Sequence, residues 1–216
     1  MFISPQNKIN VLVLSPHTDD GELGAGGFIS KLVNLNCKVS YIAFSSCEES
    51  VPEGFPKDIL AKEAKEATSI LGIKSSNLKI LDYKVREFGY HRQKILDDLI
   101  KIRNEVEYSL VLIPSLKDVH QDHQVVSAEA VRAFKNTCTI LSYDLPWNNV
   151  AFNSQCFVEL DKEEADNKFK ALSCYKSQGH RIYMQEDSIF SLMKYKGMQK
   201  GCEFAESFEV VRWFIS

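Results

Sequence analysis

Two hydrophobic patterns alternate along the chain. Four segments are short and almost continuously apolar, at residues 8–15, 39–44, 78–81 and 110–113. Such runs are typical of strands that are buried on both faces of a parallel sheet. Apolar residues recur at helical spacing in the segments that follow, at residues 22–35, 58–71, 92–106 and 124–134. Four strand–helix units in succession predict an α/β fold, namely a Rossmann-like, doubly wound and mostly parallel sheet with helices on both faces.

The pattern becomes less regular after Ile140. We expect a loop at residues 145–149, short strands at 156–160 and 209–214, and helices at 163–175 and 188–196. The chain shows no internal repeat, low-complexity tract or linker. Because its 216 residues are close to the usual size of one domain, residues 1–216 are predicted to form a single domain.

The charge balance excludes one class of partner. The chain has 26 basic and 29 acidic side chains, a formal net charge of −3, so it lacks the positive excess of nucleic-acid-binding proteins. No polybasic patch or amphipathic anchor is evident, and the longest apolar runs are far shorter than the roughly 20 residues of a membrane span. We therefore expect no nucleic-acid partner and no stable membrane association.

Cysteine usage and the N-terminus predict a cytoplasmic protein. The six cysteines are far apart and include no Cys-x-x-Cys pair, so we expect reduced thiols. Residues 1–5 lack the basic start and the sustained apolar stretch of a signal peptide. The sequence sets no oligomeric state, and a homo-oligomer is compatible with it.

Candidate chemistry lies where the predicted strands end. In an open parallel sheet, ligands bind beyond the carboxyl ends of the strands, at the point where the strand order reverses. With the common order 3-2-1-4-5, the first and fourth strands are neighbours at that point. These two strands are followed by two clusters of histidine and aspartate, namely His17, Asp19 and Asp20, and His120, Asp122 and His123. We expect the topology to bring the two clusters together although they are far apart in the sequence.

The two clusters offer the ligands of a catalytic zinc site. Such a site has three imidazole or carboxylate ligands and an open position, whereas structural zinc sites are closed and usually rich in cysteine. Taken singly, the residues also have ordinary explanations, because Asp19 could cap the following helix, Asp20 could interact with its dipole, and the histidines could be surface residues. Their joint occurrence at adjacent strand ends favours the metal site.

The same residues carry a resemblance to a known family. His17-Thr18-Asp19-Asp20 with Gly24, followed by His120-Gln121-Asp122-His123, resembles the two signatures of the PIG-L/LmbE-like family of zinc-dependent N-acetylglucosaminyl deacetylases. Thr18 stands where the family usually has proline, and Gly21 stands where many members have glutamate. The resemblance implies a metal-dependent hydrolase that removes the acetyl group from an N-acetylglucosamine-type sugar or sugar conjugate and releases acetate.

The resemblance also implies a metal and its ligands. His17, Asp20 and His123 would bind zinc, and another divalent cation such as Fe²⁺ would suit the same ligands. The ion would polarise the acetyl carbonyl and lower the pKa of water at the site.

By the same resemblance, Asp19 would be the general base and His120 would assist the departing amine. Elementary chemistry is consistent with these roles, because an unligated carboxylate can accept a proton from the attacking water. A protonated His120 could donate to the amine or to the developing oxyanion, and we expect Asp122 to orient the His120 ring and raise its pKa.

Two other functions fit parts of the pattern. His17 and Asp19 with a distant histidine match the metal triad of non-haem iron oxygenases, but the strand–helix alternation disagrees with the jelly-roll fold of those enzymes. The glycines after the first strand suggest a non-catalytic nucleotide-binding module. However, Ile29 occupies the third glycine position of the phosphate-binding fingerprint counted from Gly24. These glycines are expected instead to let the helix pack closely on the sheet.

Two further residues are candidates for substrate binding. Arg86 follows the third strand and could reach a hydroxyl or anionic group, and Trp147 could stack on a sugar ring. The sequence favours an ordinary structural role for each, with Arg86 as a surface salt-bridge partner and Trp147 as a packed loop anchor. The partner we expect is an N-acetylated amino-sugar substrate.

Overall fold

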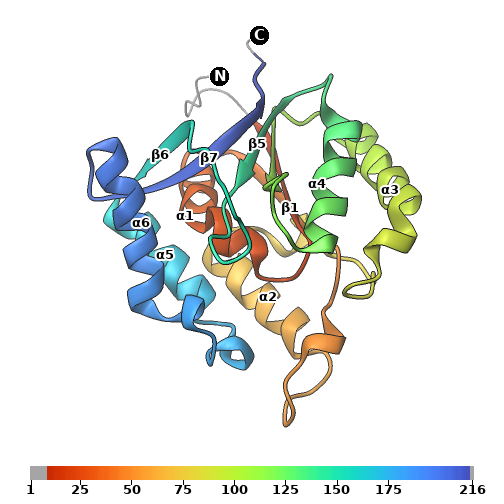
Figure 1. The fold of residues 1–216 in the computed structure, drawn as a ribbon, viewed down its shortest axis with the longest axis horizontal. Coiled ribbons are helices and arrows are strands. Elements are labelled where there is room, and N and C mark those ends of the chain that lie inside the picture. Colours follow the sequence, from red (N-terminus) through yellow and green to blue (C-terminus); the bar gives the residue numbers. More distant parts are fainter. Residues whose placement is uncertain (1–8, 215–216) are drawn as a thin grey trace.

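Seven strands form one sheet in the computed structural model, which describes residues 9–214 (Figure 1). The strands are β1 (Asn10–Ser15), β2 (Lys38–Ala43), β3 (Leu78–Ile80), β4 (Leu110–Pro114), β5 (Thr139–Tyr143), β6 (Cys156–Leu160) and β7 (Phe204–Arg212). Their order is β3-β2-β1-β4-β5-β7-β6. β1 to β5 pair in parallel, and β7 pairs antiparallel with both β5 and β6. The predicted 3-2-1-4-5 order is therefore confirmed, with two strands added beyond β5.

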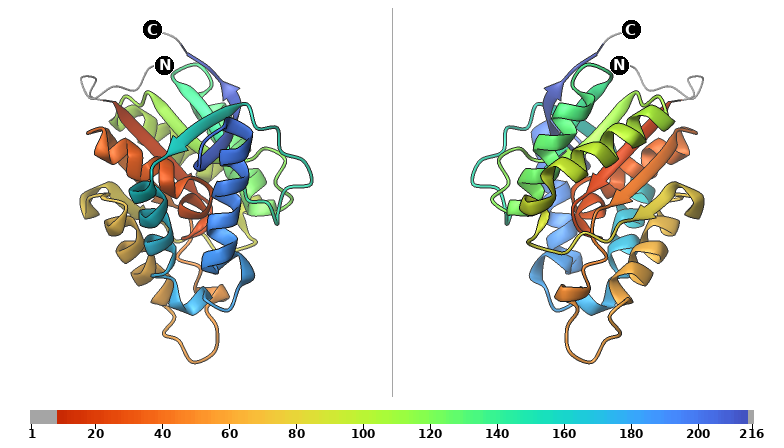
Figure 2. Two further views of the ribbon diagram at one scale, coloured as in Figure 1. Left: turned by 90° about the vertical axis from the view of Figure 1, so that its left-hand side faces the viewer. Right: turned by 90° about the vertical axis from the view of Figure 1, so that its right-hand side faces the viewer.

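Helices cover both faces of the sheet, as the doubly wound prediction requires (Figure 2). The helices are α1 (Asp20–Asn34), α2 (Ile59–Ile70), α3 (Arg92–Glu105), α4 (Gln121–Phe134), α5 (Lys162–Leu172) and α6 (Glu186–Lys200). Buried residues of α1, α2, α5 and α6 share one apolar core, and those of α3 and α4 share the other.

The strand pattern follows from this arrangement. Val11 and Val13 belong to the first core, whereas Leu12 and Leu14 belong to the second. Successive side chains of a strand point to opposite faces, so a strand between two helical layers needs apolar residues at every position. This explains why the run in β1 is continuous.

The glycines of α1 allow close packing, as predicted. A Cβ atom on Gly24 would lie 2.2 Å from the ring of Tyr143 in β5, and one on Gly27 would lie 2.3 Å from Leu160 in β6. Both distances are far below van der Waals contact, so larger residues would push the helix off the sheet.

Some element boundaries differ from the predictions. α1 begins at Asp20 rather than residue 22, and α4 begins at Gln121 rather than residue 124. The first turns of these helices are polar, so the apolar periodicity starts only after them. Lys8, where the first strand was expected to begin, and residues 1–5, on which the signal-peptide prediction rests, lie outside the described residues.

The last strand begins five residues earlier than residue 209 and ends at Arg212. Its first half carries Glu206, whose buried carboxylate pairs with Lys168 at 2.6 Å and accepts hydrogen bonds from the N–H groups of Gly27 and Phe28. A charged residue can be buried in a strand when it has such partners, and it then interrupts the apolar run by which the strand would be predicted. Across residues 9–214, none of the helices is both long and apolar enough to cross a membrane.

Candidate active site

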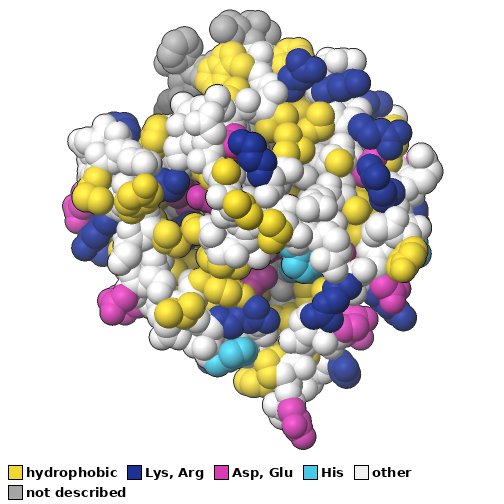
Figure 3. Space-filling model, viewed as in Figure 1, with side chains coloured by type: hydrophobic (Ala, Val, Ile, Leu, Met, Phe, Trp, Pro, Cys, Tyr) yellow, Lys and Arg dark blue, Asp and Glu magenta, His cyan; other side chains and the backbone are white. Residues whose placement is uncertain are grey.

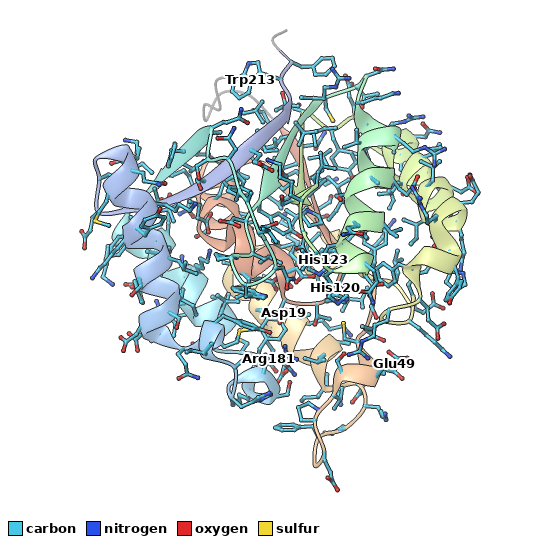
Figure 4. The ribbon with its side chains drawn as sticks, in the orientation of Figure 1. Asp19, Glu49, His120, His123, Arg181 and Trp213 are labelled. Atoms are coloured by element: carbon cyan, nitrogen blue, oxygen red, sulfur yellow. The ribbon has the colours of Figure 1, made fainter. Side chains whose placement is uncertain are left out.

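The two polar clusters meet beyond the carboxyl ends of the neighbouring strands β1 and β4. Figure 4 shows Asp19, His120 and His123 close together there, at the start of α1 and α4. The turn after β1 is held by Ser15, whose hydroxyl donates to the carbonyl of His17 at 2.5 Å and accepts from the N–H of Gly21 at 3.0 Å. The chain thus passes from strand to helix within a few residues and carries its polar side chains into the crevice.

Three potential ligand atoms converge at this point. Nδ1 of His17, Oδ2 of Asp20 and Nε2 of His123 lie 3.1–3.2 Å from one another. Ligands about 2.0–2.1 Å from a tetrahedral zinc ion are separated by about 3.3 Å. The spacing and the donor types therefore fit a zinc ion or a similar divalent cation.

His120 borders this set. One ligand atom from each of His17, His120 and His123 lies within 4.8 Å of the others, a looser spacing than that of the set containing Asp20. His120 is also the N-cap of α4, where its Nδ1 accepts a hydrogen bond from the N–H of Asp122 at 3.2 Å. When the ring is neutral, the proton consequently lies on Nε2.

The charges within the set are strongly coupled. Burial alone would raise the pKa of Asp20, but His123 and His17 outweigh it and hold the pKa well below its usual range. Burial alone would lower the pKa of His123, but Asp20 and Asp118 raise it to about 10. In the metal-free chain, protons on the histidines thus balance Asp20, and a divalent cation would replace them.

Two carboxylates contact the ring nitrogens of His17 and His123 that do not face the proposed metal position. Oδ2 of Asp118 lies 2.7 Å from Nδ1 of His123, and Oδ2 of Asp122 lies 3.2 Å from Nε2 of His17. Metal-binding histidines usually have such a partner on the second ring nitrogen. The two sequence motifs did not indicate Asp118 as a functional residue. Its position two residues before His120, in the same polar loop, was the available signal.

The expectation for Asp122 and His120 needs correction. The Asp122 carboxylate serves His17 and accepts the N–H of Arg86 at 2.6 Å, whereas its Oδ2 is 4.0 Å from Nδ1 of His120. Burial, with His17 and His123 nearby, lowers the pKa of His120 to about 4. Asp122 therefore does not make His120 a protonated acid, because desolvation and two neighbouring histidines outweigh it.

Asp19 occupies the N-cap position of α1 but does not cap the helix. Its side chain accepts no hydrogen bond from the helix N-terminus, in contrast to Asp161, which caps α5. Burial and the neighbouring Asp20 carboxylate raise the pKa of Asp19 to about 6. The simple capping explanation is thus wrong, and the carboxylate is available to the cavity that it lines.

A buried network of hydrogen bonds stabilises the turn between β1 and α1. The hydroxyl of Tyr175 lies 2.7 Å from the carbonyl of Thr18 and 2.9 Å from Oε1 of Glu22, and Tyr41 donates to the same glutamate. Burial raises the pKa of Glu22 to about 8. A Cβ atom on Gly21 would lie 2.6 Å from the Tyr41 hydroxyl. Glycine at position 21 therefore makes room for Tyr41.

A cavity of about 220 Å³ opens above these residues. It is lined by the predicted residues Arg86 and Trp147, and by residues that the motifs did not indicate, among them Cys47, Asn148, Gln178, Arg181 and Tyr183. The Trp147 and Tyr183 rings are stacked, with centroids 4.0 Å apart and planes at 9°. Trp147 is therefore both packed and exposed to the cavity.

A known protein family matches the part of the chain that forms this site. The PIG-L family, described as GlcNAc-PI de-N-acetylase, matches residues 12–134, a segment that contains both polar clusters. The chain belongs to the PIG-L family.

Two relatives of this PIG-L chain share most of its length. "Uncharacterized deacetylase YaiS" of Escherichia coli (strain K12) is 25% identical over 82% of this chain and 96% of its own. "Probable N-acetyl-alpha-D-glucosaminyl L-malate deacetylase 2" of Bacillus anthracis is 28% identical over 80% of this chain and 83% of its own.

Solved structures share the fold. The N,N'-diacetylchitobiose deacetylase from Pyrococcus horikoshii has a TM-score of 0.76 and 21% identity, over 95% of this chain and 85% of its own. GalB, the 4-carboxy-2-hydroxymuconate hydratase from Pseudomonas putida KT2440, has a TM-score of 0.79 and 18% identity, over 96% and 98%. Since a hydratase and a deacetylase both have this architecture, the reaction has to be argued from the site.

Proposed function

We propose that this PIG-L chain is a metal-dependent N-deacetylase that removes the acetyl group from an N-acetylglucosamine-type sugar or sugar conjugate and releases acetate. The observation that carries the proposal is the convergence of His17, Asp20 and His123 within 3.2 Å, next to an Asp19 carboxylate that does not cap its helix. Family membership and the deacetylase names of both relatives support the same reaction.

The metal would be held by His17, Asp20 and His123, and zinc suits this donor set, as would another divalent cation such as Fe²⁺. When bound, the ion supplies Lewis-acid activation of water and of the acetyl carbonyl. Asp118 and Asp122 would keep the two histidine rings in their orientation and tautomer.

Asp19 is proposed as the general base. The carboxylate lines the cavity beside the ligand set and makes no capping hydrogen bond, so it can accept a proton from the attacking water. It can then return this proton to the departing amine, which must be protonated to leave.

His120 is proposed as a hydrogen-bond donor. Because its Nδ1 accepts the N–H of Asp122, the neutral ring presents Nε2–H. Such a donor stabilises the negative charge that develops on the acetyl oxygen without a protonated imidazole. This revises the proton-donor role that the family resemblance implied, because the pKa of His120 is lowered to about 4.

Two residues of the cavity wall are proposed to contact the substrate. Arg86 and Trp147 line the cavity and are proposed to bind the substrate. A cytoplasmic location is proposed from the cysteine usage, because the six cysteines form no disulfide within residues 9–214. The iron-oxygenase alternative is disfavoured by the α/β sheet, and the nucleotide-binding alternative by the packing role of the α1 glycines.

A screen for acetate release tests the proposal. Purified protein would be stripped of metal, reloaded with zinc, and incubated with N-acetylated sugars, sugar nucleotides and glycosides. We expect acetate from at least one of them only after zinc is restored, and none from an Asp19→Asn variant that retains zinc. Zinc-independent acetate release, or no release from any acetylated sugar, would contradict the proposal.

A further inference from the structure

The helix α1 is kinked a few residues beyond the proposed metal ligand that it carries. Ala25 has φ −144° and ψ 16°, outside the helical region, and the helix continues on both sides of it. The stretch before the kink, residues 20–24, begins at the cavity, which Figure 3 shows as a hollow that contains histidine and acidic side chains. Kinks arise at prolines, at glycines or where side chains insert into the hydrogen bonds of the helix, and α1 contains no proline.

Lys168 and Glu206 take the place of a helical hydrogen bond at this kink. In an unbroken helix, the N–H of Gly27 would donate to the carbonyl of Leu23, four residues earlier. Here that N–H donates to Oε1 of Glu206 at 3.0 Å, and the Leu23 carbonyl accepts from Nζ of Lys168 at 2.7 Å. The next N–H, that of Phe28, donates to Oε2 of the same glutamate at 2.7 Å. Nζ and Oε1 lie 2.6 Å apart, so the ion pair bridges the two halves of the helix.

This pair comes from elements that are remote from α1 in the sequence. Lys168 lies in α5 and Glu206 in β7, and they are only 6% and 4% exposed. Glycine at position 26 makes room for the lysine, because a Cβ atom there would lie 3.0 Å from its side chain. Burying two charges is costly, and such pairs add little stability compared with apolar residues. A continuous helix would satisfy the same backbone groups without the pair, so stability alone does not account for it.

We propose that Lys168 and Glu206 are positioning residues for the deacetylation site. By fixing the kink of α1, they set the direction in which its first turn presents Asp19 and Asp20 to the metal position. Oδ2 of Asp20 lies 3.2 Å from Nε2 of His123, which belongs to another helix, so the ligand set depends on how α1 is directed. A displacement of about 1 Å in a catalytic group costs on the order of 100-fold in rate. The inference rests on the proposed function and adds the residues that hold its site in place.

A second ion pair between the same two helices provides the control. Nζ of Lys31, in the part of α1 beyond the kink, lies 2.9 Å from Oε2 of the buried Glu164 in α5. Lys31→Met removes a cation that joins α1 to α5 without changing the groups at the kink. It therefore separates an effect of the kink from a general effect of attaching α1 to α5.

The double variant Lys168→Met/Glu206→Met separates position from stability. It leaves neither charge unpaired in the interior, and it frees the N–H of Gly27 to bond with the carbonyl of Leu23 in a straighter helix. We expect its urea midpoint to exceed that of either single variant, because each single change leaves a buried charge without its partner. Its zinc affinity, measured by competition with a chelator, should nevertheless fall by about 10- to 100-fold. At saturating zinc, kcat should fall by about 10- to 100-fold while KM changes by less than about threefold.

Glu206→Gln is a milder change that keeps the side-chain volume and one acceptor oxygen. It should show the same losses of zinc affinity and kcat to a smaller extent, and it decides the question if the double variant does not fold. Lys31→Met should lower the urea midpoint and leave zinc affinity and kcat unchanged.

Three results would contradict the expectations in different ways. Unchanged zinc affinity and kcat in the folded double variant would overturn the inference while the proposed function stands. Equal losses in Lys31→Met would also overturn it, because any contact between α1 and α5 would then have the same effect. If the unmodified protein binds zinc but releases no acetate, the proposed function is overturned. The zinc affinities of the variants then still decide whether the pair positions the ligands.

Discussion

Asp118 Oδ2 lies 2.7 Å from Nδ1 of His123, and both side chains are almost completely buried. The other carboxylate oxygen accepts the N–H of His120 at 2.8 Å. One carboxylate therefore joins the start of α4 to the ring of a proposed metal ligand. This contact leaves Nε2 of His123 directed at His17 and Asp20.

Replacing Asp118 with asparagine should lower zinc affinity by about 10- to 100-fold, as is usual for the outer partner of a metal-binding histidine. The amide is nearly isosteric but lacks the charge that fixes the ring tautomer. Zinc affinity would be measured by competition with a chelator, with the exposed Asp82→Asn as a charge-matched control. An unchanged affinity in Asp118→Asn would show that the contact has no such role.

The adjacent carboxylates Asp19 and Asp20 should respond differently to the same change. Asp19→Asn should keep its zinc and lose most of its deacetylation, because an amide cannot accept a proton from water. Asp20→Asn should lose zinc affinity first and recover activity in part when zinc is in excess. Metal content and acetate release would be compared across a zinc titration, and rescue of Asp19→Asn by zinc would reverse the two roles.

His120 offers a variant that separates its two functions. Asparagine is a good N-cap, so His120→Asn should preserve the start of α4 while removing the imidazole donor. We expect zinc content to be retained and kcat to fall by about 10²- to 10³-fold, as for the loss of one oxyanion donor. Loss of zinc from this variant would instead make His120 a ligand, as the group of three histidines would allow.

Zinc binding should compete with protons. Burial alone would lower the pKa of His123, yet Asp20 and Asp118 raise it to about 10, so this ring is protonated at pH 7 in the metal-free chain. Because the ligand must be neutral, zinc binding should release at least one proton at pH 7, and affinity should rise with pH until the ring is neutral. Calorimetry in two buffers of different ionisation enthalpy measures the protons released. A heat that does not depend on the buffer would contradict this expectation.

Close packing of α1 on the sheet should make Gly24 intolerant of a methyl group. The new Cβ of Gly24→Ala would lie 2.2 Å from the ring of Tyr143, whose hydroxyl is bonded to the carbonyl of Leu14. We expect the free energy of unfolding to fall by about 1–3 kcal/mol, as for other overpacked cores. Gly89→Ala is the control, because nothing lies within 4 Å of the position of its Cβ. Both would be measured by urea denaturation, and equal effects would mean that the contact at Gly24 relaxes freely.

Several features could be predicted because they depend on local pattern. The continuous apolar run of β1 and the periodicity of α3, which was placed within one residue of its observed end, follow from burial on one or two faces. The predicted strand order then brought His17 and His123 into the same crevice, where their ring nitrogens lie 3.1 Å apart. The prediction failed at Phe204–Phe208, because the burial of Glu206 depends on Lys168, a partner far away in the sequence.

The sequence by itself determined the α/β alternation, the two polar clusters and the family resemblance, because each depends only on which residue types occur at short spacing along the chain. Only the tertiary structure decided which carboxylate orients which histidine, that Asp19 does not cap its helix, and that Arg181 joins Arg86 at the cavity. Those relationships depend on distances between segments that are remote along the chain. Burial and neighbouring charges then set the pKa of each group, and neither is defined until the chain has folded.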